Sequence, residues 1–140
     1  MEIYRTKIPK LAGTDYREIN RKARRMFKDI ASRTKRKPYV RSAYFKKEKV
    51  FLDYFWRHVE EMHWKDRIRR LRYYSCGLDL IMNARVEPII KSNPNKLAEK
   101  LYRFVGMTAD KELFAVQIKE DLKRGEKHFI SVFPLGKDGA

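Results

Sequence analysis

Apolar residues recur at helical spacing from Tyr16 to Ile30, and this pattern predicts an amphipathic helix near the start of the chain. Asp15 precedes the apolar pattern and Glu18 follows three residues later, which is typical of a capping box at a helix start. The opposite side of the predicted helix is basic, so it is a candidate surface for an anionic partner. It carries Arg17, Arg21, Lys22, Arg24, Arg25 and Lys28.

The central part of the chain is its most apolar stretch. Apolar residues follow helical spacing from Val50 to Met62 and again from Ile68 to Met82. The polar residues 63–65 between them indicate a break. We therefore predict two helices here, and we assign their aromatic side chains to the core.

Four segments have the composition or the alternation of β-strands. They are residues 39–45, 101–107, 113–119 and 128–134. Residues 85–100 hold two prolines and two asparagines, so we interpret them as a connecting loop. The expected fold class is therefore α+β, with N-terminal and central helices packed on a small antiparallel sheet of about four strands.

The length of 140 residues fits one domain. We expect residues 1–140 to fold as a single unit, with residues 1–13 as an N-terminal arm and residues 136–140 as a frayed tail. The chain has no internal repeat and no linker long enough to mark a second domain.

The last two predicted strands form a hairpin whose register decides what its faces carry. If Ile118 pairs with Phe129, one face becomes almost purely apolar and suits a core. Gln117, Lys119 and His128 then meet on the second face. A shift of one residue would exchange the faces of the final strand, so the sequence leaves both registers open.

The charge balance is the strongest compositional signal. Lys and Arg number 34 and Asp and Glu number 18, which gives a net charge of +16. Such an excess implies a polyanionic partner, most often nucleic acid and less often an anionic membrane surface; a generally basic proteome is the alternative. Residues 17–47 contain 13 Lys and Arg against two acids, so the charge is local.

Phosphate contacts are expected from this segment and from a second arginine cluster near residue 70. The candidates are Arg17, Arg21, Arg24, Arg25, Lys28, Arg69 and Arg70. The alternative for such a charge run is a solvated helix face.

Several classes are disfavoured by what the sequence lacks. The one cysteine, Cys76, cannot form an internal disulfide, which suits a reducing compartment. There is no Cys/His spacing for zinc, no phosphate-binding glycine loop, and neither an HExxH nor a GxSxG motif, so we expect no metal and no cofactor. The N-terminus does not resemble a signal peptide, and no apolar run approaches the ~18 residues of a membrane span. We expect a cytoplasmic protein without membrane association.

A cationic sheet face that carries a histidine suits the cleavage of RNA. The reaction needs a base for the 2′-hydroxyl, an acid for the leaving 5′-oxygen and cations for the pentacovalent phosphate, and His, Lys, Tyr and Arg supply these without metal. Residue types alone are permissive here, because any basic α+β domain offers some of them.

The C-terminal block resembles the sheet of the barnase–EndoU–colicin–RelE superfamily of small nucleases, in particular its phage- and mobile-element-associated members. The block reads "YRFVGMTADKELFAVQIKEDLKRGEKHFISVFP". Its matching elements are a strand ending in glycine (Phe104 to Gly106), a strand of the form F-x-V-x-I (Phe114 to Ile118) and a closing strand near I-S-x-F (Ile130 to Phe133). The resemblance covers about a third of the chain.

This resemblance implies a metal-independent ribonuclease or toxin-like activity, often neutralised by an acidic antitoxin or inhibitor protein. Carried onto this chain, Arg41 and Lys119 stabilise the phosphate and His128 acts as acid or base. Tyr44 orients or stacks a base, and Ser131 donates a hydrogen bond. RNA is favoured over DNA as the substrate.

Two other functions stay open. In the first, the protein is a non-enzymatic nucleic-acid-binding accessory protein of a mobile element, with residues 17–47 contacting phosphates. In the second, its positive face meets an acidic protein partner.

Overall fold

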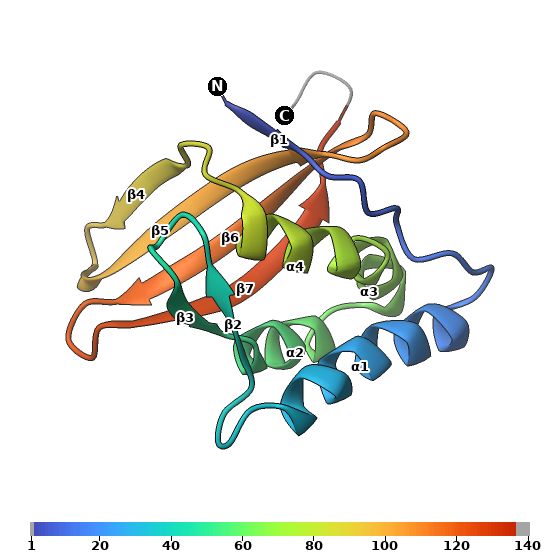
Figure 1. Ribbon diagram of the computed structural model, residues 1–140, viewed down its shortest axis with the longest axis horizontal. Coiled ribbons are helices and arrows are strands. Elements are labelled where there is room, and N and C mark those ends of the chain that lie inside the picture. The colour runs from blue at the N-terminus through green and yellow to red at the C-terminus, as the bar shows by residue number, and fades with distance from the viewer. Residues whose placement is uncertain (1, 137–140) are drawn as a thin grey trace.

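Seven strands and four helices make up residues 2–136, the part of the chain that the computed structural model describes (Figure 1). The strands are β1 (Ile3–Arg5), β2 (Tyr39–Ser42), β3 (Glu48–Phe51), β4 (Ile89–Asn93), β5 (Lys96–Met107), β6 (Leu113–Asp121) and β7 (Glu126–Pro134). The helices are α1 (Tyr16–Ser32), α2 (Asp53–Glu60), α3 (Trp64–Leu71) and α4 (Tyr74–Asn83). Residues 137–140, most of the expected tail, lie outside the described part.

The strands form one mixed, curled sheet in the order β1-β5-β6-β7-β3-β2. β5 is long enough to pair with two strands along one edge: β1 at residues 105–107 and β4 at residues 96–103. β1 runs parallel to β5 and β3 runs parallel to β7, whereas the other pairs are antiparallel. β2 ends the order, so one of its edges has no neighbouring strand.

The expected small antiparallel sheet of four strands is therefore wrong. The segment interpreted as a loop contains β4, because Pro88 precedes the ladder and Pro94 occupies the following turn, where neither removes a ladder hydrogen bond. Val50 lies in β3 rather than in a helix. The arm also contributes a strand, since β1 adds to the edge of β5.

The first helix begins where the sequence predicts. The Asp15 side chain accepts a hydrogen bond from the backbone N–H of Glu18 at 2.9 Å, as in a capping box. The break predicted near residues 63–65 is also confirmed, since α2 ends at Glu60 and His63 caps α3. The central region nevertheless contains three helices rather than two.

One face of the sheet, which we call the near face, packs against α4 (Figure 1). Phe114, Val116 and Ile118 of β6 point toward it and are fully buried. α4 comes close to β7 at Gly77, where an added Cβ would lie 3.3 Å from Val132. This apolar layer between the helices and the near face is the core.

The opposite face, which we call the far face, carries the alternating residues of the same strands, including Lys119 and His128. β3 pairs with β7 only at residues 127–128, and α2 and α3 pack along the rest of β7. From this edge they extend Tyr54 and Arg70 to the far-face side chains of β7. The far face therefore collects residues from the sheet and from two helices.

Candidate active site

The hairpin adopts the register in which Ile118 pairs with Phe129 and Lys119 with His128. A β-bulge leaves Ile130 without a partner, so Ser131 pairs with Gln117 and turns to the far face. Uninterrupted alternation would have placed Ile130 and Val132 on that face instead. The bulge thus adds a polar residue to the far face and returns Val132 to the core.

Four polar side chains form a row across the far face, contributed by β5, β6, β7 and α3. Arg103 is opposite Gln117, whose amide oxygen, when turned toward it, accepts from Arg103 Nη2 at 3.0 Å. Arg70 Nη1 donates to Ser131 Oγ at 2.5 Å. Both guanidinium groups lie over the Phe133 ring, 5.2 Å (Arg70) and 5.4 Å (Arg103) from its centroid. We call Arg70, Arg103, Gln117 and Ser131 the arginine row.

A lysine and a carboxylate lie beside the arginine row. Lys119 Nζ is 3.3 Å from Glu99 Oε1, and the two side chains keep 27% and 26% of their surface exposed. The same ammonium lies 5.1 Å from the centroid of the Tyr54 ring. Burial lowers the pKa of the Arg70 guanidinium, helped by Arg69 and opposed by Asp66. The cluster therefore combines a desolvated cation with a second arginine, a lysine and a carboxylate that water can reach.

His128 lies on the far face but is buried beneath aromatic side chains. Its ring stacks on Tyr54 at 4.0 Å with an interplanar angle of 7°, and Phe51 lies 5.7 Å away. The residue is 2% exposed, and its Nδ1 has no hydrogen-bond partner among the described residues. Burial lowers the pKa of His128 below its ordinary 6.5, although Glu126 opposes the shift. The imidazole is therefore neutral at pH 7 and supports the Tyr54 ring rather than meeting solvent.

The other two residues expected at the catalytic centre lie elsewhere. Arg41 is exposed on β2, where its Nη1 donates to the Lys47 carbonyl at 3.0 Å. Tyr44 packs against Phe104, with ring centroids 5.3 Å apart, on the near face. Burial raises the pKa of Tyr44, and Glu87 adds to the shift. Lys119, His128 and Ser131 thus share the far face, whereas Arg41 lies at the sheet edge and Tyr44 on the opposite side.

A basic groove runs beside β2 and β3, with a volume of about 770 Å³. Lys49 Nζ lies 4.7 Å from the Tyr39 ring and Lys37 Nζ lies 5.9 Å from the Phe51 ring. Among the described residues that line the groove, Glu126 is the one acid. The groove is lined by Arg33, Lys35, Arg36, Lys37, Tyr39, Lys49, Phe51 and Glu126. Phe51 also contacts His128, so the groove adjoins the far-face cluster.

The residues expected to contact phosphate are distributed over three surfaces. Arg17, Arg21, Arg25 and Lys28 are exposed along α1. Arg24 is held within the fold, since it pairs with Glu60 at 3.1 Å and lies 4.5 Å from the Trp56 ring. Arg69 is exposed beside Asp66, and Arg70 belongs to the arginine row.

Sequence reasoning did not select Arg103 or Glu99, and it included the groove residues 33–37 only as part of the basic segment 17–47. Alternation along residues 99–103 could have placed Glu99 and Arg103 on one face, but the length of β5 was underestimated. The groove had a clearer signal, namely the cations of residues 33–37 directly before the aromatic β2.

The chain matches no protein-family model, and it has no significant similarity to any curated protein or solved structure with which it was compared. Within residues 2–136, none of the helices has the length and apolar character needed to cross a membrane. In the same part of the chain, no three His, Cys, Asp or Glu side chains gather closely enough to hold a metal ion.

Proposed function

We propose that the protein is a metal-independent ribonuclease whose active site is the arginine row together with Lys119 and Glu99. The observation that carries the proposal is that two arginines, held by Ser131 and Gln117, share the far face with Lys119 and its partly exposed carboxylate partner Glu99. Cations at fixed positions stabilise the charge that develops on phosphorus oxygens during phosphodiester cleavage. Gln117 and Ser131 hold the two guanidinium groups in place.

The reaction uses the 2′-hydroxyl of RNA as its nucleophile. Glu99 takes the hydroxyl proton, the 2′-oxygen bonds to phosphorus, and the bond from phosphorus to the 5′-oxygen breaks. The leaving 5′-oxygen takes a proton from the Lys119 ammonium. The products are a 2′,3′-cyclic phosphate and a 5′-hydroxyl end. His128 has no proton-transfer role in this assignment, because it is buried beneath Tyr54 and cannot reach the substrate.

Cleavage of short single-stranded RNA in EDTA tests the proposal. Arg70→Ala should lower the cleavage rate by about 100-fold or more, since removal of one charge-stabilising donor typically has that effect. Arg69→Ala is the matched control, because Arg69 is the exposed neighbour whose partner is Asp66. It should leave the rate within about twofold of wild type, as exposed substitutions usually do.

Two readouts make the test specific. Product ends should be a cyclic phosphate and a 5′-hydroxyl, and a 2′-deoxy nucleotide at the cleaved position should block the reaction. Equal rates for Arg70→Ala and wild type, with both variants folded by circular dichroism, would refute the assignment.

Binding of nucleic acid without cleavage is the second candidate, and the basic groove favours it. Five cations around two aromatic rings match the way proteins hold single strands, with phosphates on the cations and bases stacked on the rings. This function predicts tight binding of RNA that stays intact in the cleavage assay.

A further inference from the structure

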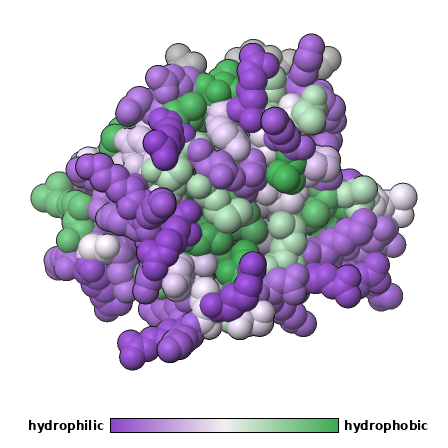
Figure 2. Space-filling model, in the orientation of Figure 1, coloured by the Kyte–Doolittle hydropathy of each residue, from purple (hydrophilic) through white to green (hydrophobic). Residues whose placement is uncertain are grey.

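An apolar cleft of about 510 Å³ opens between α1, α4 and the edge of β2. The volume lies within the range of small-molecule sites, roughly 300–1,000 Å³. Figure 2 shows hydrophobic atoms in the middle of this side of the molecule, bordered by hydrophilic ones. The apolar lining consists of Ile8, Met26, Ile30, Val40, Leu78 and Met82.

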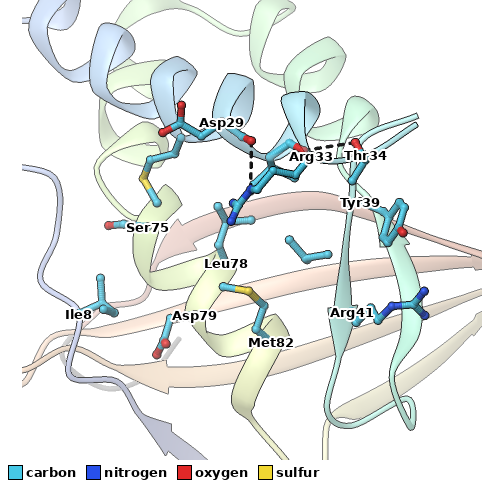
Figure 3. A pocket seen from close by; sticks show the side chains of 13 residues that line it. Ile8, Asp29, Arg33, Thr34, Tyr39, Arg41, Ser75, Leu78, Asp79 and Met82 are labelled. Atoms are coloured by element: carbon cyan, nitrogen blue, oxygen red, sulfur yellow. Dashed lines mark hydrogen bonds between the residues drawn. The ribbon is translucent and has the colours of Figure 1, made fainter. Parts of the chain in front are cut away.

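The edge of β2 gives the cleft unpaired backbone groups. The Pro38 carbonyl accepts from the Leu52 N–H at 3.1 Å, so Pro38 and every second residue after it bond toward β3. The residues between them, Tyr39 and Arg41, therefore direct their backbone N–H and C=O groups away from β3. Those groups have no backbone partner within residues 2–136. Both residues line the cleft, and in Figure 3 the Arg41 side chain points away from it. Donors and acceptors therefore border an otherwise apolar space.

The cleft interior does not suit a phosphate, because Asp29 and Asp79 line it. The Asp79 carboxylate is already engaged, accepting from Tyr4 at 2.8 Å and Thr6 at 2.6 Å. Arg33 lies on the cleft wall, where its Nε donates to the Asp29 carbonyl at 3.2 Å (Figure 3). A neutral, planar ligand with hydrogen-bonding edges fits this combination better than an anion does.

Arg33 and Tyr39 line both the cleft and the basic groove, so the two spaces adjoin. A strand that places phosphates on the groove cations could extend a base past Tyr39 into the cleft. We propose that the cleft binds one unstacked base of the RNA strand, at a fixed distance from the scissile bond. The base packs on the apolar lining, and the free backbone groups of β2 meet its hydrogen-bonding edge. This inference rests on the proposed function and names its specificity site.

Abasic scanning of a short 2′-O-methyl RNA tests the cleft directly, because this strand cannot be cleaved. Affinity is measured by fluorescence anisotropy for strands that each lack one base. Loss of the base that enters the cleft should weaken binding by about tenfold, and loss of neighbouring bases should have less effect. 2-Aminopurine at the sensitive position should change its fluorescence on binding.

Met82→Asp places a carboxylate in the cleft at a residue that is 42% exposed and so leaves the core intact. This variant should bind the intact strand as weakly as wild type binds the abasic one, with no further loss on the abasic strand. Leu97→Asp, at an exposed position near the start of β5 and outside the cleft, should match wild type. Tight binding that is insensitive to every abasic position would overturn the cleft assignment without contradicting the proposed RNA cleavage. If none of the strands binds, the cleft assignment is overturned as well.

Discussion

Lys127 and Lys119 lie on neighbouring strands of the same sheet, yet their surroundings differ. Lys127 is on the near face with 8% of its side chain exposed, and its Nζ contacts Glu48 at 3.0 Å and Glu120 at 3.3 Å. Lys119 is on the far face, is 27% exposed and has one carboxylate partner, Glu99. The near-face cation is enclosed and doubly paired, whereas the far-face cation keeps capacity for another anion.

One sheet thus carries an enclosed ion-pair network on one face and a more exposed cation on the other. The partners of Lys127 are themselves held, since Tyr102 donates to Glu120 at 2.6 Å. Such a network leaves no place for a ligand. On the far face, the hydrogen bonds of Arg70 and Arg103 hold each guanidinium and leave other N–H groups for the substrate that we propose.

The largest effect should come from breaking the near-face network. Lys127→Ala leaves the Glu120 carboxylate largely buried without its cation, and it should lower the free energy of unfolding by about 3 kcal/mol. Lys119→Ala removes a partly exposed pair and should cost about 1 kcal/mol or less while lowering RNA cleavage. Urea unfolding of both variants measures the contrast. Equal losses of stability would show that the two lysines are not distinct.

A smaller effect should come from His128. Its pKa is lowered in the folded chain, so the unfolded chain binds a proton first as the pH falls below about 6.5, and stability decreases there. The decrease is at most about 1.4 kcal/mol per pH unit. Unfolding in urea between about pH 7 and pH 5 should show this slope in wild type and a flatter one in His128→Gln.

His58→Gln provides the control, because His58 is exposed on α2. It should keep the wild-type slope. A His128→Gln variant with the same slope as wild type would mean that another group causes the pH dependence.

The smallest effect per residue should come from substitutions in the basic groove, and it should appear in RNA binding. Replacing Lys35, Arg36 and Lys37 with alanine should reduce the salt dependence of single-strand RNA binding, with the slope of log K against log salt falling by about 2. The stability of the fold should change little, since all three are exposed. An unchanged slope would place the strand elsewhere, for instance on α1, where Arg17→Ala and Arg21→Ala should then reduce it.

Local sequence patterns predicted much of the fold. The capping pair Asp15 and Glu18, and the alternation of residues 113–118, identified α1 and the central strand. The short strands β1, β3 and β4 were missed, since each is specified by its partner rather than by its own residues. Val50, for example, fits a helical pattern locally, and its place in the sheet depends on Lys127, its partner 77 positions later in the chain.

The candidate site was only partly predictable for a related reason. Lys119 and Ser131 were selected from the hairpin, and Arg70 from its charge. Their grouping depends on a bulge and on the packing of α3 along β7, neither of which leaves a local pattern. His128 shows the opposite case: residue type suggested acid–base chemistry, while burial by Tyr54 and Phe51 gives it a supporting role.

The unpaired Ile130 also determines how this hairpin can change by insertion or deletion. Residues on its two sides follow opposite alternation, so deleting Ile130 would join them into one regular ladder, with Ser131 still on the far face and Val132 still in the core. A single deletion there should therefore keep both the hydrophobic layer and the polar residues of the far face in place. Length variation should also be tolerated in the exposed connection at residues 122–125, which lies beyond the paired strands.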